Sequence, residues 1–232
     1  MQRCTSLLSL FRPGSLPGEH RSSGDRIAAR QNRRSETLHH LHEISSMKTS
    51  SGLHPAMTTL SVYIIIPNWN GWRDTIECLE AVQALDYPSC CAVVIDNGSW
   101  DGSCDRIRDW ARGNTRVRSN YVAHRPDRKP ITVVAYDRPI AERGGDPRSE
   151  RSLGQLPAHD KLVLVRSEEN LGFAGGCNVG IRYALAAGAD YVWLLNNDAV
   201  PEPAALGKLV DFLESHPDYQ GVTGQIRLYD DP

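Results

Sequence analysis

Four short apolar runs limit the folds open to this chain, because each is rich in β-branched or aromatic residues and stops at polar ones. The runs lie at residues 61–66, 92–95, 162–165 and 191–195. Continuous apolar runs of this length are typical of parallel strands that helices cover on both faces. Between the runs, apolar residues recur at helical spacing, as from Trp72 to Leu85. The alternation predicts an α/β fold with a mainly parallel, Rossmann-like sheet and helices on both faces.

Three more helices and a fifth strand are expected from the same pattern. One helix begins near Ser103, one follows residue 180, and one starts at Pro203. The fifth strand is expected at residues 221–229. The helical residues expected to face the core are Ile107, Trp110, Ile181, Ala184, Leu185, Leu206, Leu209, Val210 and Leu213.

Two segments lack the apolar pattern. Residues 1–57 are rich in Arg, Ser, His and Gly, which favours a disordered tail or an extension from an early start codon, with a transit peptide as the other interpretation. Residues 58–232 would then form the folded domain. Residues 114–160 form a basic insertion whose apolar piece at 131–136 is a candidate strand. This insertion is either a solvated loop or a surface that attracts an anionic acceptor.

Composition excludes several classes of protein. The net charge of −2 argues against a nucleic-acid-binding protein. No apolar run approaches the roughly 20 residues that a transmembrane helix needs. The six cysteines form no Cys-x-x-Cys pair, which indicates reduced thiols in the cytoplasm rather than a disulfide framework. A cytoplasmic protein, or one peripheral to the inner face of a membrane, is therefore expected.

Three of the expected strands end in polar loops, at residues 67–71, 96–103 and 196–198. Because the carboxyl ends of parallel strands share one edge of a sheet, these loops should meet where open α/β sheets bind ligands. Asp198, with Asn196 nearby, offers the hard oxygen ligands that Mg²⁺ or Mn²⁺ prefers when it bridges a diphosphate. The other interpretation is a set of simple turns, since Asn and Asp are common turn residues.

Four motifs carry a resemblance to a known family. They are Pro67-Asn68-Trp69-Asn70-Gly71, Asp96-Asn97-Gly98-Ser99-Trp100-Asp101-Gly102-Ser103, Glu169-Asn170-Leu171-Gly172-Phe173-Ala174-Gly175-Gly176 and Leu195-Asn196-Asn197-Asp198. In order and spacing they resemble family 2 of the glycosyltransferases, which have the GT-A fold, and most closely its rhamnosyltransferase-like branch. The resemblance covers residues 61–229. It implies a nucleotide-diphospho-sugar donor and a metal ion, Mg²⁺ or Mn²⁺.

The resemblance also implies roles for single residues. Pro67 and Trp69 would line a nucleobase pocket, and Asp96 would accept a hydrogen bond from the imide N–H of uracil or thymine. Asp198, with Asn196, would hold the metal. The residues implied in nucleotide-sugar binding are Pro67, Trp69, Asn70, Asp96, Asn97, Ser99, Asn170, Gly172, Gly175, Asn178 and Asn197. Cys177 departs from the family, many members of which have Asn or Arg there.

The implied reaction is transfer of a sugar, such as rhamnose from dTDP-rhamnose, to a hydroxyl of a polysaccharide or lipid-linked acceptor, with inversion. The acidic pair that supplies the family's general base has no counterpart before Pro232. We therefore expect that base beyond Pro232 and keep a second hypothesis, a nucleotide-sugar-binding fragment without turnover. A dinucleotide-dependent oxidoreductase is disfavoured, because residues 67–71 replace the Gly-x-Gly-x-x-Gly that should follow its first strand.

Overall fold

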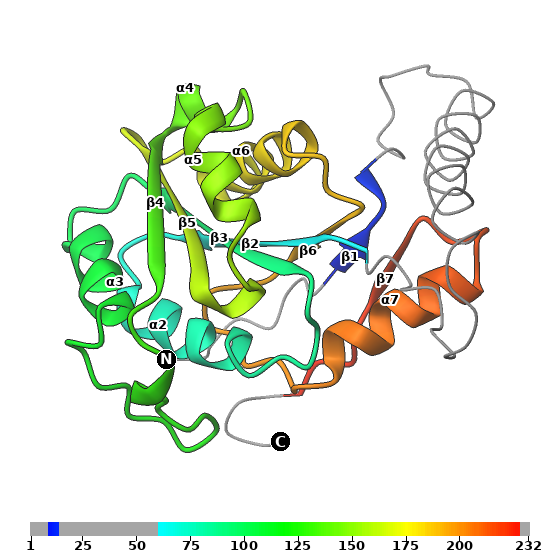
Figure 1. Cartoon of the computed structure of the whole chain (residues 1–232), viewed down its shortest axis with the longest axis horizontal. Coiled ribbons are helices and arrows are strands. Elements are labelled where there is room, and N and C mark those ends of the chain that lie inside the picture. The colour runs from blue at the N-terminus through cyan, green and yellow to red at the C-terminus, as the bar shows by residue number, and fades with distance from the viewer. Residues whose placement is uncertain (1–8, 14–59, 228–232) are drawn as a thin grey trace, which may run out of the picture. The chain divides into compact units, whose positions relative to one another are not determined.

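The computed structural model describes residues 9–13 and 60–227. Its sheet has the order β4-β5-β3-β2-β6-β1-β7 (Figure 1). The strands are β1 (Ser9–Phe11), β2 (Val62–Asn68), β3 (Cys90–Asn97), β4 (Thr132–Asp137), β5 (Lys161–Ser167), β6 (Tyr191–Leu194) and β7 (Gly221–Thr223). Strands β4, β5, β3, β2 and β6 are parallel, whereas β1 runs antiparallel to both β6 and β7. The predicted α/β fold with a mainly parallel sheet is confirmed.

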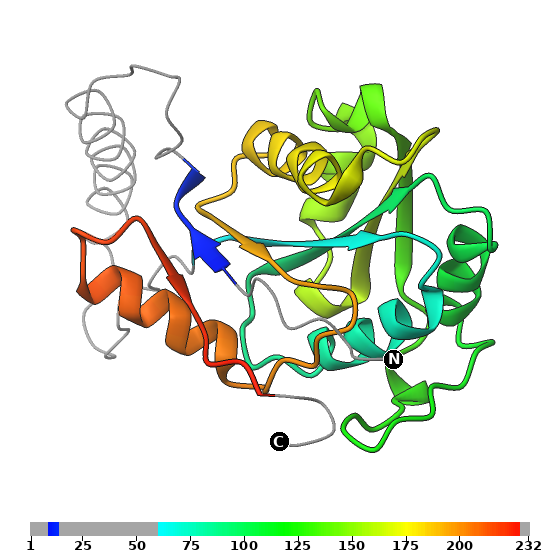
Figure 2. The same cartoon turned by 180° about the vertical axis from the view of Figure 1, so that it is seen from behind.

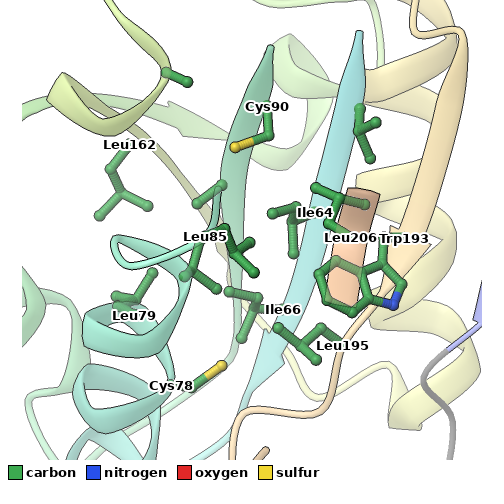
Figure 3. Packing of buried hydrophobic residues seen from close by; sticks show 14 of the residues in the cluster. Ile64, Ile66, Cys78, Leu79, Leu85, Cys90, Leu162, Trp193, Leu195 and Leu206 are labelled. Atoms are coloured by element: carbon green, nitrogen blue, oxygen red, sulfur yellow. The ribbon is translucent and has the colours of Figure 1, made fainter. Parts of the chain in front are cut away.

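Helices cover both faces of this sheet (Figures 1 and 2). They are α2 (Trp72–Val82), α3 (Ser103–Ala111), α4 (Arg138–Ala141), α5 (Pro147–Gly154), α6 (Gly172–Ala186) and α7 (Ala205–Ser215), with 3₁₀ turns η2 (Pro126–Arg128) and η3 (Ala158–Asp160). Apolar residues of α2, α3 and α7 pack in one cluster with Ile64 and Ile66 of β2 (Figure 3). Residues of α4, α5 and α6 pack with Ile65 on the opposite face. Successive residues of β2 therefore serve both layers. Within the described ranges, no helix is long and apolar enough to span a membrane.

Helix α6 begins earlier than the sequence pattern indicates. It starts at Gly172 instead of after residue 180, so the glycine-rich motif forms its first turns. A Cβ at Gly180 would overlap Ile65 Cγ2, which explains how the helix packs so closely on β2. Ile181 and Ala184 are buried as expected, but Leu185 is 43% exposed. The expectation for Leu185 is wrong because the close packing at Gly180 sets which side of the helix meets the sheet.

Residues 9–13 were expected to lie outside the folded domain, and the structure corrects this. Leu10 is fully buried and pairs with Trp193 of β6 and Val222 of β7. Arg12 donates from Nε to the Tyr191 hydroxyl at 2.9 Å and from Nη2 to the Leu213 carbonyl at 2.8 Å. A strand of three residues with only two apolar side chains, Leu10 and Phe11, gives too short a signal to be indicated by the sequence. The rest of the predicted tail, residues 1–8 and 14–57, lies outside the described residues.

The basic insertion at 114–160 contains regular structure. The candidate strand at 131–136 is present as β4, which pairs with β5, and α4 and α5 are two short helices that the pattern did not indicate. Glu80, near the end of α2, contacts both α3 and the insertion: its Oε1 accepts from Trp110 Nε1 at 2.9 Å and lies 3.5 Å from Lys129 Nζ. Since α2 and α3 return to the amino edge of the sheet, the loop 114–130 lies at that edge, away from the polar strand ends.

The expected fifth strand is also shorter than predicted. Only Gly221–Thr223 form β7, and residues 228–229 lie outside the described part. Its hydrogen-bonding partner is β1 instead of a parallel neighbour. The outer part of the sheet therefore depends on the short segment 9–13.

We predict that Leu10→Ala lowers the free energy of unfolding by about 2–5 kcal/mol, because it removes a fully buried side chain at the junction of three strands. Chemical denaturation measures this. Ser9→Ala is the matched control, since the exposed Ser9 hydroxyl bonds only to the Thr223 hydroxyl among the described residues, and its effect should stay within about 0.5 kcal/mol. Equal effects of the two changes would show that β1 does not stabilise the domain.

Candidate functional site

Polar side chains gather at the carboxyl edge of the parallel sheet. Asn68 ends β2, Asn97 ends β3 and Ser167 ends β5, and all three are buried. The strand register places Asn68 beside Asp96 and Asn97 beside Ser167. Buried polar groups need hydrogen-bond partners, so the contacts of these residues determine the shape of the edge.

Asp96 is only 3% exposed, and two side chains hold its carboxylate. Asn68 Nδ2 donates to Oδ1 at 2.8 Å, and Cys104 Sγ donates to Oδ2 at 3.2 Å. Burial, helped by the charge of Asp96, raises the pKa of Cys104 to about 12, so the thiol stays protonated as a donor. Each carboxylate oxygen can accept two hydrogen bonds. Asp96 can therefore take a further donor from a ligand at its small exposed part.

Asn97 holds the turn between β5 and α6. Its Nδ2 donates to Asn170 Oδ1 at 2.9 Å and to the Gly172 carbonyl at 3.0 Å, while its Oδ1 accepts from Leu171 N at 3.0 Å. Asn170 Oδ1 also accepts from Gly172 N at 2.8 Å. The Asn170–Gly172 turn is thus fixed directly beside the end of β3.

The loops after β2 and β3 are tied to each other. Asn70 N donates to Ser99 Oγ, and Trp100 N donates to Asn70 Oδ1, both at 2.9 Å. Asn70 has a φ of +50°, a conformation that costs energy in residues other than glycine. These bonds hold two loops that present exposed indoles: Trp69 is 55% and Trp100 83% exposed. Exposed aromatic side chains on fixed loops can stack on planar or sugar rings of a ligand.

The loop after β6 packs on the start of α2. Asn197 Nδ2 donates to Thr75 Oγ1 at 3.1 Å, and Cys78 Sγ donates to the Asn196 carbonyl at 3.6 Å. Burial raises the pKa of the Cys78 thiol, and the nearby charge of Asp198 adds to this rise. Figure 3 shows Cys78 on α2, close to Ile66 and Leu195. Helix α2 therefore contacts both the loop 196–198 and, through the hydrogen bond from Thr75 to Asn68, the end of β2.

One atom of this loop is suited to bind a cation. Asn196 Oδ1 is buried and has no hydrogen-bond partner in the part of the chain that the structure describes. A buried amide oxygen without a donor is costly, and a divalent ion that prefers oxygen ligands would satisfy it. Across residues 9–13 and 60–227, no three His, Cys, Asp or Glu side chains gather as a metal site. An ion held here would thus use Asp198, amide oxygens and oxygens of the ligand.

The remaining predicted residues lie on the same loops and helix. Pro67 is partly exposed near the end of β2, Gly175 lies in the first turns of α6, and Asn178 is an exposed residue further along α6. Sequence reasoning missed Asn68, Thr75 and Cys104. Asn68 stood within a quoted motif without a role, whereas Thr75 and Cys104 gave no signal, because a helix pattern does not show which polar side chain faces a neighbouring loop.

Comparisons with known proteins support one family for part of the chain. Residues 147–232 match the model described as Glycosyl transferase family 2. This segment includes α6, β6 and the loop 196–198. A galactofuranosyltransferase of Mycolicibacterium smegmatis is 31% identical over 107 residues, which are 46% of this chain and 33% of that protein. The matched part thus spans about a third of the relative's length.

A solved structure gives a weaker likeness. The mannosyltransferase of Pyrobaculum calidifontis, in complex with GDP-Man and Mn²⁺, matches with a TM-score of 0.42 and 21% sequence identity. The match covers 76% of this chain and 39% of that chain.

We predict that Gly98→Ala destabilises the protein more than Gly102→Ala. Both glycines have positive φ, 75° and 78°, so both changes carry a backbone cost of about 1–2 kcal/mol. A Cβ at Gly98 would also lie 2.7 Å from the Glu169 carbonyl carbon, whereas a Cβ at Gly102 meets nothing within 4 Å. The overlap should add about 1–3 kcal/mol in chemical denaturation. Equal losses of unfolding free energy in the two variants would mean that the backbone at Glu169 moves away from the added Cβ without an energetic cost.

Proposed function

We propose that this chain carries the donor-binding part of a glycosyltransferase, which moves a sugar from a nucleoside diphosphate to a hydroxyl acceptor. The observation that supports this most is the single hydrogen-bonded site formed by the ends of β2, β3 and β6. The match of residues 147–232 to glycosyl transferase family 2 supports the same chemistry.

The ends of β2 and β3 would bind the nucleobase. The exposed Trp69 offers a face for stacking, and Asp96 offers a carboxylate to an imide N–H. The edge of uracil or thymine carries one such donor between two carbonyls. A buried carboxylate that faces the wrong base edge costs about 1–3 kcal/mol. Adenine has no ring N–H on this edge, so uridine and thymidine nucleotides should bind more tightly than adenosine nucleotides.

The loop 196–198 would lie at the diphosphate. Asp198 and the unpartnered Asn196 Oδ1 would hold Mg²⁺ or Mn²⁺, which when bound offsets the charge that develops on the departing diphosphate. Asn197 would contact the donor through its amide oxygen, because its nitrogen bonds to Thr75. Burial keeps the Cys78 thiol under this loop protonated, so it adds no negative charge.

For the finer specificity, we propose a deoxysugar donor of the dTDP-rhamnose type, a polysaccharide or lipid-linked acceptor, and inversion at the anomeric carbon. The four motifs at 67–71, 96–103, 169–176 and 195–198 support it through their resemblance to the rhamnosyltransferase-like branch. Because one relative is named as a galactofuranosyltransferase, a galactofuranosyl donor is the alternative that should be compared with the rhamnosyl donor. Turnover of both donors with a hydroxyl acceptor should be measured side by side.

Nucleotide selectivity tests this proposal. Calorimetry with Mn²⁺ compares UDP, dTDP, ADP and GDP, and UDP and dTDP should bind at least about tenfold more tightly than ADP. Asp96→Asn should remove most of this preference, because an amide cannot offer the same pair of acceptors. Asp101→Asn is the matched control: its carboxylate lies in the same loop but accepts from Ser103. Equal affinity of the unchanged protein for all four nucleotides would refute the base pocket.

The metal dependence gives an independent test. Mn²⁺ should tighten UDP binding to the unchanged protein, and Asp198→Asn should abolish this effect, since it removes the charged ligand from the loop. Asp211→Asn, an exposed change on α7, serves as the control and should keep the full effect of Mn²⁺. If Asp198→Asn responds to Mn²⁺ as the unchanged protein does, the assigned ligand is wrong.

A further inference from the structure

A continuous path of hydrogen bonds, buried except at its Asn197 end, joins the loop 196–198 to Asp96. Asn197 Nδ2 donates to Thr75 Oγ1 at 3.1 Å, Thr75 Oγ1 donates to Asn68 Oδ1 at 2.8 Å, and Asn68 Nδ2 donates to Asp96 Oδ1 at 2.8 Å. The Gly71 carbonyl, 3.0 Å from Thr75 Oγ1, is a second and more distant acceptor for the hydroxyl. We call Asn68 and Thr75 the bridge.

The Asp96 carboxylate sets the direction of every hydrogen bond along this path. A carboxylate accepts but cannot donate, so Asn68 must turn its nitrogen toward Asp96 and its oxygen toward Thr75. The hydroxyl of Thr75 then donates to that oxygen and can only accept from Asn197. Hydrogen bonds aligned in this way polarise one another, especially away from water. Thr75 is fully buried and Asn68 is 1% exposed, so water does not compete for these groups.

The bridge also determines which atom Asn197 offers to a ligand. The Gly71 carbonyl, an acceptor, lies 3.4 Å from Asn197 Nδ2, and Thr75 Oγ1 takes the same nitrogen. The amide oxygen is therefore the atom left for a donor molecule or cation. A Cβ at Gly71 would lie 2.8 Å from Asn197 Nδ2, so this approach requires the absence of a side chain at residue 71.

We propose that Asn68 and Thr75 are positioning residues that couple the two halves of the site, so that contacts at Asp96 strengthen contacts at Asn197 and the reverse. The inference rests on the proposed function, since it assigns Asp96 to the nucleobase and Asn197 to the diphosphate-sugar side. It adds a mechanism for selectivity: the matching base would orient the group that meets the diphosphate. Neither bridge residue touches the ligand.

The coupling is measurable as non-additivity. Residues without a shared partner usually act additively on binding free energy, whereas residues in one hydrogen-bond network do not. UDP binding with Mn²⁺ is measured by calorimetry on the full chain for Asp96→Asn, Asn197→Ala and the double variant. We expect the double variant to depart from the product of the single effects by at least about fivefold, the lower end of usual coupling.

The same cycle is then repeated with Thr75→Val, which keeps the shape of the side chain but removes the hydroxyl. In this background, the departure of the double variant from additivity should fall below about twofold, because the hydrogen-bonded path is broken between Asn68 and Asn197. Ser167→Ala is the matched control: this buried hydroxyl at the same edge of the sheet bonds to the Glu169 carbonyl, outside the bridge. The cycle of Asp96→Asn and Asn197→Ala in the Ser167→Ala background should keep the fivefold departure from additivity. If Thr75→Val does not fold, Gly71→Ala takes its place, since it displaces Asn197 without removing a polar group.

The outcomes separate the two proposals. Loss of non-additivity in Thr75→Val or Gly71→Ala, with retention in Ser167→Ala, supports the bridge. A merely structural role of Thr75 would weaken UDP binding in all variants but leave the departure from additivity unchanged, and that result overturns the inference alone. If Asp96→Asn and Asn197→Ala act additively on UDP binding when no other residue is changed, the inference is overturned as well. If the unchanged protein binds neither UDP nor dTDP, the proposed function fails, and the coupling fails with it.

Discussion

The buried carboxylate of Asp96 is the constraint on which the polar edge of the sheet depends. A charge with 3% exposure requires donors around it, because its transfer from water is otherwise very costly. Asn68 and Cys104 supply them. Once Asn68 Nδ2 faces Asp96, its oxygen must face Thr75, and the arrangement extends to the loop after β6. One buried charge thus orients residues from one neighbouring strand, two helices and the loop after β6.

Much of the fold could be predicted from the sequence, because a parallel sheet buried on both faces needs strands that are apolar at nearly every position. The runs within β2, β3, β5 and β6 carry that signal. The three residues of β1 do not, since a strand so short is stabilised by its neighbours β6 and β7 instead of by its own pattern. The start of α6 is predicted too late for another reason: the glycines between residues 172 and 180 suggest a loop, whereas Gly180, in the middle of the helix, permits close packing on Ile65.

The candidate site was predictable only in part, for a similar reason. Polar residues after a buried strand indicate an edge, so Asp96, Asn97 and the loop 196–198 could be placed together. Thr75 could not, because it lies within an amphipathic helix and only the fold shows that it faces Asn197. The family match begins at residue 147 and thus excludes Asp96 and Thr75. The hydrogen bonds connect this earlier half of the site to the half that the family model recognises.

Cys104 shows what such an environment does to a reactive side chain. Oxidants and electrophiles attack the thiolate form of cysteine, but burial and the adjacent Asp96 raise the pKa of this thiol to about 12. At neutral pH the sulfur is therefore a weak nucleophile, although it is only partly buried and lies beside the Asp96 carboxylate. The same contact that holds Asp96 thus protects Cys104 from covalent damage. A reagent directed at this sulfur would have to separate the thiol from the Asp96 carboxylate before it could react.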